Sequence, residues 1–258
     1  MVGFSLPAGH KYSIRLFNMI LKFNEFINEQ HLSSELEELE KLEELNINQG
    51  DDLTAFCWDA KKENASKFDS VFKAEPLSDS TLARMMGRSY PGEDKCEISI
   101  RNLRYLIIPH YDGKGAIRIG ELVCHKKASD DFLYLFKELF KHKYPIERMV
   151  LIDDYNGDDS KSMAANNTSS FNYRVIAGTD KLSRHAFGMA IDINPLYNPY
   201  VKGTFVSPES GEPYVNRSKE FKYKISRKDL VYKILHDKFG FTWGGDWENC
   251  KDYQHFEK

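Results

Sequence analysis

The sequence predicts a mixed fold of helices and strands, of the α+β or α/β class. Three observations support it: a mainly helical segment opens the chain, two strands joined by a turn follow, and an amphipathic helix then leads to a further strand. A chain of 258 residues can bury a sizeable core without disulfide bonds. We therefore expect one large domain, or one domain with a smaller piece attached.

The first part of the chain is expected to be a helical extension. Residues 14–47 carry Leu, Glu, Phe and Ile at helical spacing, and Ser33 and Ser34 precede acidic residues as a helix N-cap does. Residues 48–97 are mixed in character and rich in turn signals. We predict an N-terminal extension over 1–97, whose role the sequence does not reveal, and the main domain over 98–258.

The elements of the main domain follow from alternation and helical periodicity. Residues 103–109 and 117–123 read as strands around a turn at 112–115, and residues 126–142 read as an amphipathic helix. Another strand is predicted at 148–152. The polar stretch 153–183 is longer than most loops in compact domains, so we expect it to be functional or disordered, with Phe171 as an apolar anchor.

Composition excludes several classes of function. The net charge is −3 and no basic stripe is present, so we expect no nucleic-acid partner. No apolar run approaches the roughly 20 residues of a membrane-spanning helix. The apolar run at 16–21 is interrupted by Asn18 and followed by Lys22, so we interpret it as the start of a helix and not as a signal peptide. The four cysteines lack C-x-x-C spacing, which leaves free thiols or one bridge.

Two segments near the C-terminal end carry the chemistry. The first runs from Ser183 to Asp192 and the second from Asp252 to Glu257. Together they offer His185, Asp192 and His255 as ligands for one Zn²⁺ per chain, with a fourth position left open for water. The carboxylate of Asp252 is the candidate general base.

The local geometry of both segments can be anticipated. A strand over 189–193 would place Ala190 and Asp192 on one face and the apolar residues on the other. Asp252 and His255 have an odd offset, so a straight strand would point them apart. For both to reach one site, the chain must bend between them.

Other polar residues have open roles. Arg174 is a candidate to bind an oxyanion or a substrate carboxylate, because its guanidinium is a planar two-pronged donor. Asp246 is the chief rival of Asp252 as base, although a carboxylate that stabilises a turn is the better interpretation. Glu257 is either a partner that orients a ligand or a surface carboxylate.

These segments resemble the D-alanyl-D-alanine carboxypeptidase family of zinc peptidases, the M15 peptidases. Residues 183–192 match its S-x-H-x-x-G-x-A-x-D signature, and Asp252-Tyr253-Gln254-His255 resembles its acid-x-x-His motif. Residues 166–174 look like a bacterial carboxypeptidase-like branch. Over 98–258 the resemblance implies a compact α+β domain, a central antiparallel sheet flanked by helices. It also implies zinc on the three ligands named above and Asp252 as base.

The resemblance also implies a substrate-activating arginine upstream of the first zinc histidine. Arg174 is our candidate, with Arg184 as the alternative, and Ser183 is expected to support the site. The implied substrates are bacterial peptidoglycan stem peptides, cut next to a D-amino acid by a D,D-carboxypeptidase or an endopeptidase. We accordingly expect a monomer of the cell envelope, periplasmic or secreted.

Two rival functions stay open from the sequence. The chain is alternatively a non-catalytic, zinc-containing module that binds peptidoglycan, although an intact base argues against a pure binding site. A peptidase that acts on peptides from outside the cell wall is a further alternative. The sequence does not decide which bond is cut.

Overall fold

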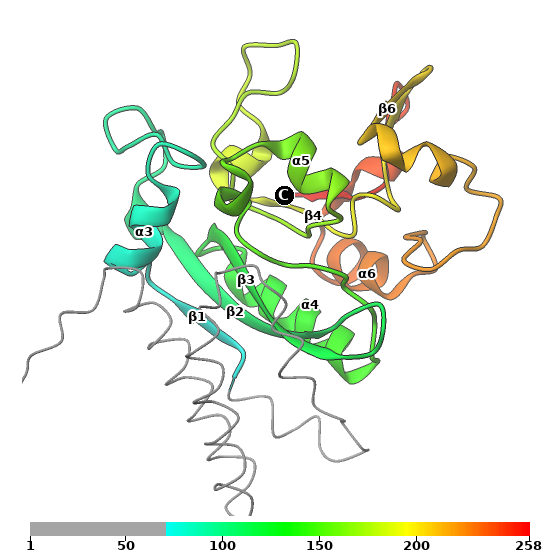
Figure 1. The fold of residues 1–258 in the computed structure, drawn as a ribbon, viewed down its shortest axis with the longest axis horizontal. Helices are drawn as coiled ribbons and strands as arrows, with labels where there is room; N and C mark the ends of the chain where they lie inside the picture. Colours follow the sequence, from blue (N-terminus) through cyan, green and yellow to red (C-terminus); the bar gives the residue numbers. More distant parts are fainter. Residues whose placement is uncertain (1–70) are drawn as a thin grey trace, which may run out of the picture. The chain divides into compact units, whose positions relative to one another are not determined.

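The computed structural model describes residues 71–258, which belong to one compact unit. The helical prediction for 14–47 and the turn-rich start of 48–97 fall outside the described residues. Within them the fold is α+β, as predicted: helices combine with antiparallel strands (Figure 1). In place of one central sheet, the strands form three small sheets of three strands each.

The first sheet has the order β1-β2-β3 and contains the predicted strand pair. Strands β2 (Leu103–Tyr111) and β3 (Ile117–His125) form a long hairpin, and the short β1 (Lys73–Glu75) pairs with β2. Both predicted strands are confirmed and run two residues further than expected. Most residues of both strands are buried, so the hairpin is stabilised by burial of largely continuous apolar runs.

Helix α4 (Ser129–Lys141) confirms the predicted amphipathic helix and packs on this sheet. Its apolar stripe is buried, and the ring of Phe140 stacks on Tyr111 with centroids 4.9 Å apart. Phe72 meets Phe140 edge to face at 5.9 Å. Aromatic contacts of this kind fasten the helix more firmly than burial of area alone.

Residues before 98 contribute to the same core. Helix α3 (Asp79–Met85) begins at the N-cap Ser78, and Met85 and Tyr90 are fully buried in a cluster with Leu103. The 3₁₀ helix η3 (Ile100–Asn102) then leads into β2. The division of the chain at 97/98 stays a prediction, but residues 71–97 pack with the elements that follow.

The strand predicted at 148–152 does not form, and this prediction is wrong. Arg148 makes only an isolated bridge with Asn167. The side-chain amide of Asn167 takes the place of a neighbouring strand: its Oδ1 accepts from the Val150 N–H at 2.8 Å, and its Nδ2 donates to the Val150 carbonyl at 3.0 Å. The backbone is thus satisfied without a ladder.

The long polar stretch is folded. It contains the 3₁₀ helix η4 (Ile152–Tyr155) and helix α5 (Asp159–Ala164), which is capped by Asp158. Residues 166–172 are buried although most are polar, because their side chains bond to neighbouring backbone groups. Phe171 is buried in the core cluster, as predicted.

The other two sheets hold the C-terminal part. One has the order β4-β9-β7, built from β4 (Ala190–Asp192), β9 (His255–Glu257) and β7 (Thr242–Trp243). The other has the order β6-β5-β8, and its strands are β6 (Phe205–Ser207), β5 (Tyr200–Lys202) and β8 (Lys251–Asp252). The helical segments among them are η5 (Arg184–Phe187), η6 (Glu209–Tyr214), α6 (Leu230–Tyr232), η7 (Lys233–Lys238, a π-helix) and η8 (Gly244–Asp246).

Two further findings bear on the sequence analysis. Among residues 71–258, no helix has the length and apolar character needed to cross a bilayer. Cys96, Cys124 and Cys250 are free thiols, and the fourth cysteine falls outside the described residues.

Candidate metal centre and active site

Three of the predicted site residues meet on one face of the β4-β9-β7 sheet. Asp192 ends β4 and His255 begins β9, and the two are directly paired across the antiparallel strands. His185 comes from η5, which precedes β4. The opposite face carries Ile191 and Phe256, both fully buried. The predicted alternation of β4 is thereby confirmed, and β4 lies beside the C-terminal end of the chain (Figure 1).

The side chains of this cluster are buried and close together. His185 Nε2 lies 3.1 Å from His255 Nδ1 and 3.2 Å from Asp192 Oδ2, and His255 Nδ1 lies 2.9 Å from Asp192 Oδ1. Ligands on a tetrahedral zinc ion at about 2.0–2.1 Å stand roughly 3.3 Å apart. A carboxylate and two imidazoles at this separation therefore fit a zinc ion in both donor type and spacing.

The ring of His185 is held so that one nitrogen stays available to a metal ion. Its Nδ1 donates to the backbone carbonyl of Ser170 at 2.6 Å, so Nε2 is the ring nitrogen that points toward the cluster. Its backbone N–H donates to the Ser183 hydroxyl, the N-cap of η5. The Ser170 hydroxyl in turn donates to the Ala190 carbonyl at 2.6 Å, which joins this support to β4.

His255 is oriented in the same manner from the other side. Its Nε2 lies 3.2 Å from Glu257 Oε2, so its Nδ1 faces the cluster. Trp247 forms a wall, with its ring centroid 5.4 Å from that of His255. Of the two interpretations open for Glu257, this contact favours a partner that orients the candidate ligand His255.

The electrostatics of the cluster favour a bound cation. Burial disfavours the ionised form of Asp192, but the charge of His185 and hydrogen bonds from both imidazoles hold its pKa well below the usual range. Burial likewise opposes protonation of His255, yet Asp192 and Glu257 raise its pKa to about 10. A divalent cation bound here would displace any proton held by these groups, because metal ligands must be deprotonated.

Gly188 permits a close approach that fixes His185 in place. It ends η5 in the left-handed region at φ 64°, and its carbonyl accepts from the His125 backbone N–H at 2.9 Å. A Cβ atom at this position would lie 2.5 Å from that same nitrogen. Only glycine combines this conformation with this contact.

The predicted bend between Asp252 and His255 is present. Asp252 belongs to β8 and His255 to β9, which lie in different sheets. The turn between them is held by Trp243 Nε1, which donates to the Tyr253 carbonyl at 3.0 Å, and by the Gln254 carbonyl, which accepts from the Ile193 N–H.

The turn is also fastened from outside by Arg217. Its guanidinium lies over the Tyr253 ring at 4.4 Å. The same group donates to the carbonyls of Tyr197 and Ile225 and to the Oδ1 of Asn198. Nothing in the local sequence around position 217 indicates this contact with the second motif.

The carboxylate of Asp252, the candidate base, is buried and closely packed. Gly244 packs against it so closely that a Cβ at 244 would lie 2.6 Å from the Asp252 Cβ. Its Oδ1 is buried without a hydrogen-bond partner in the described residues. Burial, reinforced by the charge of Asp192, raises the pKa of Asp252 to about 7, although His255 lowers it.

The two candidate arginines differ in their surroundings. Arg174 Nη2 pairs with Asp159 Oδ2 at 2.7 Å, while its Nε is buried without a partner in the described residues. Arg184 is exposed and acts electrostatically on Glu257. The assignment of either arginine to substrate stays a prediction.

Asp246, the rival base, is engaged elsewhere. Its Oδ1 accepts from Arg227 at 2.8 Å, and its Oδ2 accepts from the Tyr232 hydroxyl at 3.4 Å. This arrangement agrees with the interpretation of Asp246 as a carboxylate that stabilises local structure.

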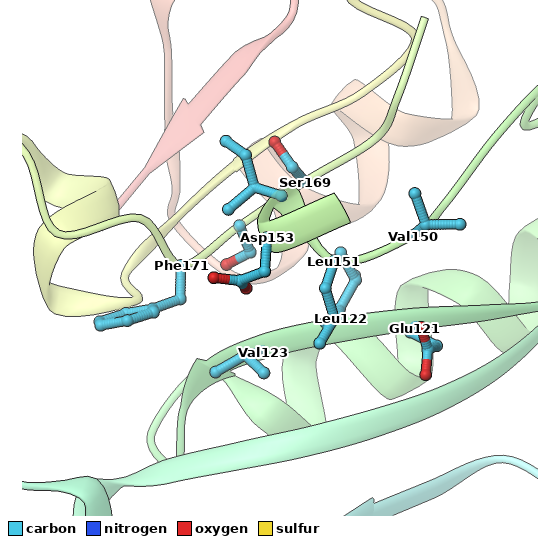
Figure 2. Close-up of a pocket in the computed structure, with 10 residues that line it drawn as sticks. Glu121, Leu122, Val123, Val150, Leu151, Asp153, Ser169 and Phe171 are labelled. Carbon is cyan, nitrogen blue, oxygen red and sulfur yellow. The ribbon is translucent and has the colours of Figure 1, made fainter. Parts of the chain in front are cut away.

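A small pocket lies behind the backbone that supports His185. It is bordered by β3, by residues 150–153 and by residues 169–171, and Figure 2 shows Asp153 beside Phe171 and Leu151. Asp153 accepts from the Ser89 backbone N–H and hydroxyl, both at 3.0 Å. This carboxylate is therefore engaged in fastening residue 89 and not in forming a second reactive centre.

A comparison with protein families agrees with the motifs. The model of a family described as D-alanyl-D-alanine carboxypeptidase matches residues 177–258. No curated protein and no solved structure matches the chain. The matched stretch contains all three clustered residues and Asp252, and it indicates a peptidase.

Proposed function

We propose, from the premise that residues 177–258 belong to the D-alanyl-D-alanine carboxypeptidase family, that this protein is a zinc-dependent peptidase of bacterial peptidoglycan stem peptides. It cuts a bond next to a D-amino acid, as a D,D-carboxypeptidase or as an endopeptidase. The observation that carries the proposal is the buried His185–Asp192–His255 cluster. Close to it, a carboxylate oxygen of Asp252 is buried without a hydrogen-bond partner among residues 71–258. A substrate in the wall places the protein in the cell envelope.

The proposed ligands are His185 Nε2, His255 Nδ1 and Asp192. Each imidazole has its other nitrogen engaged, by Ser170 or by Glu257, so that the free lone pairs face inward. When bound there, Zn²⁺ supplies a more acidic water and polarises the scissile carbonyl.

Asp252 is the proposed general base and acid. With a pKa raised to about 7, its carboxylate can accept a proton from the attacking water and return it to the departing amine. A carboxylate at the ordinary pKa would be a poor donor to that amine. The close packing of Gly244 holds this group in one orientation.

Arg174 is the proposed substrate-binding cation. Its Nη2 is held by Asp159, and its Nε is a donor without a partner in the part of the chain that the structure describes. A carboxylate or oxyanion of the substrate would satisfy this donor. Arg174→Lys would keep the charge, lose the planar geometry, and so raise KM.

The test combines metal content with mass spectrometry of muropeptides. We expect about one zinc per chain and either loss of a terminal D-Ala or cleavage within the stem. Asp252→Asn should abolish turnover and keep zinc, whereas the matched control Asp246→Asn should keep both. Near-normal turnover by Asp252→Asn would overturn its role.

The rival functions are outcomes of the same experiment. One zinc with no cleavage, under conditions where a control peptidase works, would indicate a module that only binds peptidoglycan. Cleavage of ordinary L-peptides at comparable rates would indicate a peptidase that is not specific for the wall.

A further inference from the structure

The β6-β5-β8 sheet presents one continuous face that begins at Asp252. Tyr200 pairs with Asp252 on one side and with Ser207 on the other, and Lys202 pairs with Phe205. Antiparallel partners share a face, and so do residues two apart on a strand. These five side chains therefore lie on the same face, which we name the hairpin face.

Phe205 is unusually exposed on this face. It is 61% exposed, the highest value among the exposed large apolar side chains of residues 71–258. Its ring meets Tyr200 edge to face with centroids 6.3 Å apart. Single exposed apolar residues are common on proteins, but here two rings form a row that ends at the candidate base.

The third side chain of interest on this face is a cation. Lys202 is exposed and lies directly opposite Phe205. It has no ion-pair partner among residues 71–258. The hairpin face thus combines an apolar platform with an unused positive charge, a combination that suits a peptide carrying a carboxylate.

The distance from Asp252 fits a substrate that extends beyond the scissile bond. Adjacent strands lie about 4.8 Å apart, so β6 runs roughly 10 Å from β8. An extended peptide covers that distance in about three residues. The hairpin of β5 and β6 also projects from the body of the fold (Figure 1), and Lys202 and Phe205 at its end are exposed.

We propose that the hairpin face is a substrate subsite, and this rests on the proposed function. Phe205 and Tyr200 bind the apolar surface of a peptide segment about three residues from the scissile bond, and Lys202 pairs with a carboxylate of that segment. The enzyme accordingly prefers extended stem peptides, joined to sugar or cross-linked, over a short peptide that contains only the scissile bond.

The test compares Phe205→Ala with wild type on two substrates that share the scissile bond. One is a disaccharide carrying its whole stem peptide, and the other is an acylated dipeptide. We expect KM to rise about tenfold on the long substrate, equivalent to about 1.4 kcal/mol, and to change less than about twofold on the short one. Phe205→Trp, which keeps an aromatic ring, should have a KM close to that of wild type on the long substrate.

Two controls separate binding from structure. Met86→Ala removes another exposed apolar side chain, at the end of α3, and should leave both KM values unchanged. Lys202→Gln should raise KM on the long substrate only, and the effect should shrink at high salt because exposed charges are screened. An equal loss on both substrates, or no loss on either, would overturn the subsite.

Failure of the proposed function gives a different result. If wild type cleaves neither substrate, the peptidase proposal fails, and retention on insoluble peptidoglycan then judges the hairpin face. Weaker retention of Phe205→Ala than of wild type would support the subsite as a binding surface. Equal retention of the two proteins would overturn it.

Discussion

Gly188→Ala should be among the most damaging single-methyl changes in the described part of the chain. The new Cβ would lie 2.5 Å from the His125 nitrogen and 3.0 Å from the Cys124 carbonyl carbon, whereas ordinary contacts begin near 3.4 Å. Both atoms belong to the backbone of β3, so neither can turn away. The clash must be relieved by moving η5 away from β3.

The cost has three physical sources. Alanine in the left-handed region costs about 1–2 kcal/mol, and overpacking against a rigid backbone costs about 1–3 kcal/mol. Stretching the hydrogen bond from the His125 N–H to the Gly188 carbonyl adds about 1 kcal/mol. We therefore expect the free energy of unfolding to fall by about 3–6 kcal/mol.

Gly240→Ala is the matched control. Gly240 also follows a helical segment at positive φ, +73°, but nothing lies within 4 Å of the position that an alanine methyl group would take there. This change should cost only about 1 kcal/mol. Urea denaturation of both variants in the presence of a chelator, monitored with two spectroscopic probes, measures the difference between their free energies of unfolding. A gap below about 1 kcal/mol would refute the reasoning from close approach.

Three more predictions follow from other parts of the structure. Zinc at about a thousand times its Kd should stabilise the protein by about 4 kcal/mol and raise Tm by roughly 8–16 °C. Calorimetry with and without zinc tests this prediction. Asp192→Asn should abolish the shift in Tm. Arg217→Lys should lower the free energy of unfolding, measured by urea denaturation, by about 2–3 kcal/mol, because lysine cannot reproduce the planar donors and the stack on Tyr253. The control Arg227→Lys changes an exposed ion pair and should lower it by less than about 1 kcal/mol. Burial raises the pKa of Asp229 to about 6. The folded protein therefore binds a proton on the Asp229 carboxyl group more tightly than the unfolded chain does. The free energy of unfolding of the wild type should consequently fall as pH rises from about 4 to 6. Asp229→Asn keeps the helix cap, so its stability relative to wild type should rise over that range by up to about 3 kcal/mol; a difference independent of pH would contradict this.

The sequence was sufficient where structure depends on neighbours along the chain. The hairpin of residues 103–125 and the amphipathic helix follow from alternation and periodicity, and the face of β4 follows from its Ala-Ile-Asp pattern. The need for a bend before His255 followed from an odd offset alone. In each case the signal lies within about ten residues.

The predictions from sequence fail where side chains distant along the chain determine the backbone structure. The strand expected at 148–152 is absent because the amide of Asn167 satisfies Val150. The strands divide into three small sheets, and Asp252 and His255 belong to different ones. No pattern within either segment indicates this division. Arg217 reaches Tyr253 through a contact that sequence spacing does not encode.

The strand pairing that joins Asp192 to His255 has a kinetic consequence. These residues are 63 positions apart, whereas the β2-β3 hairpin closes between Tyr111 and Ile117. Short loops close with a smaller loss of chain entropy and earlier in folding than long ones. The proposed metal centre should therefore be assembled last. If it binds zinc, the rate of zinc uptake during refolding would report when the C-terminal strands dock onto a preformed hairpin and helix.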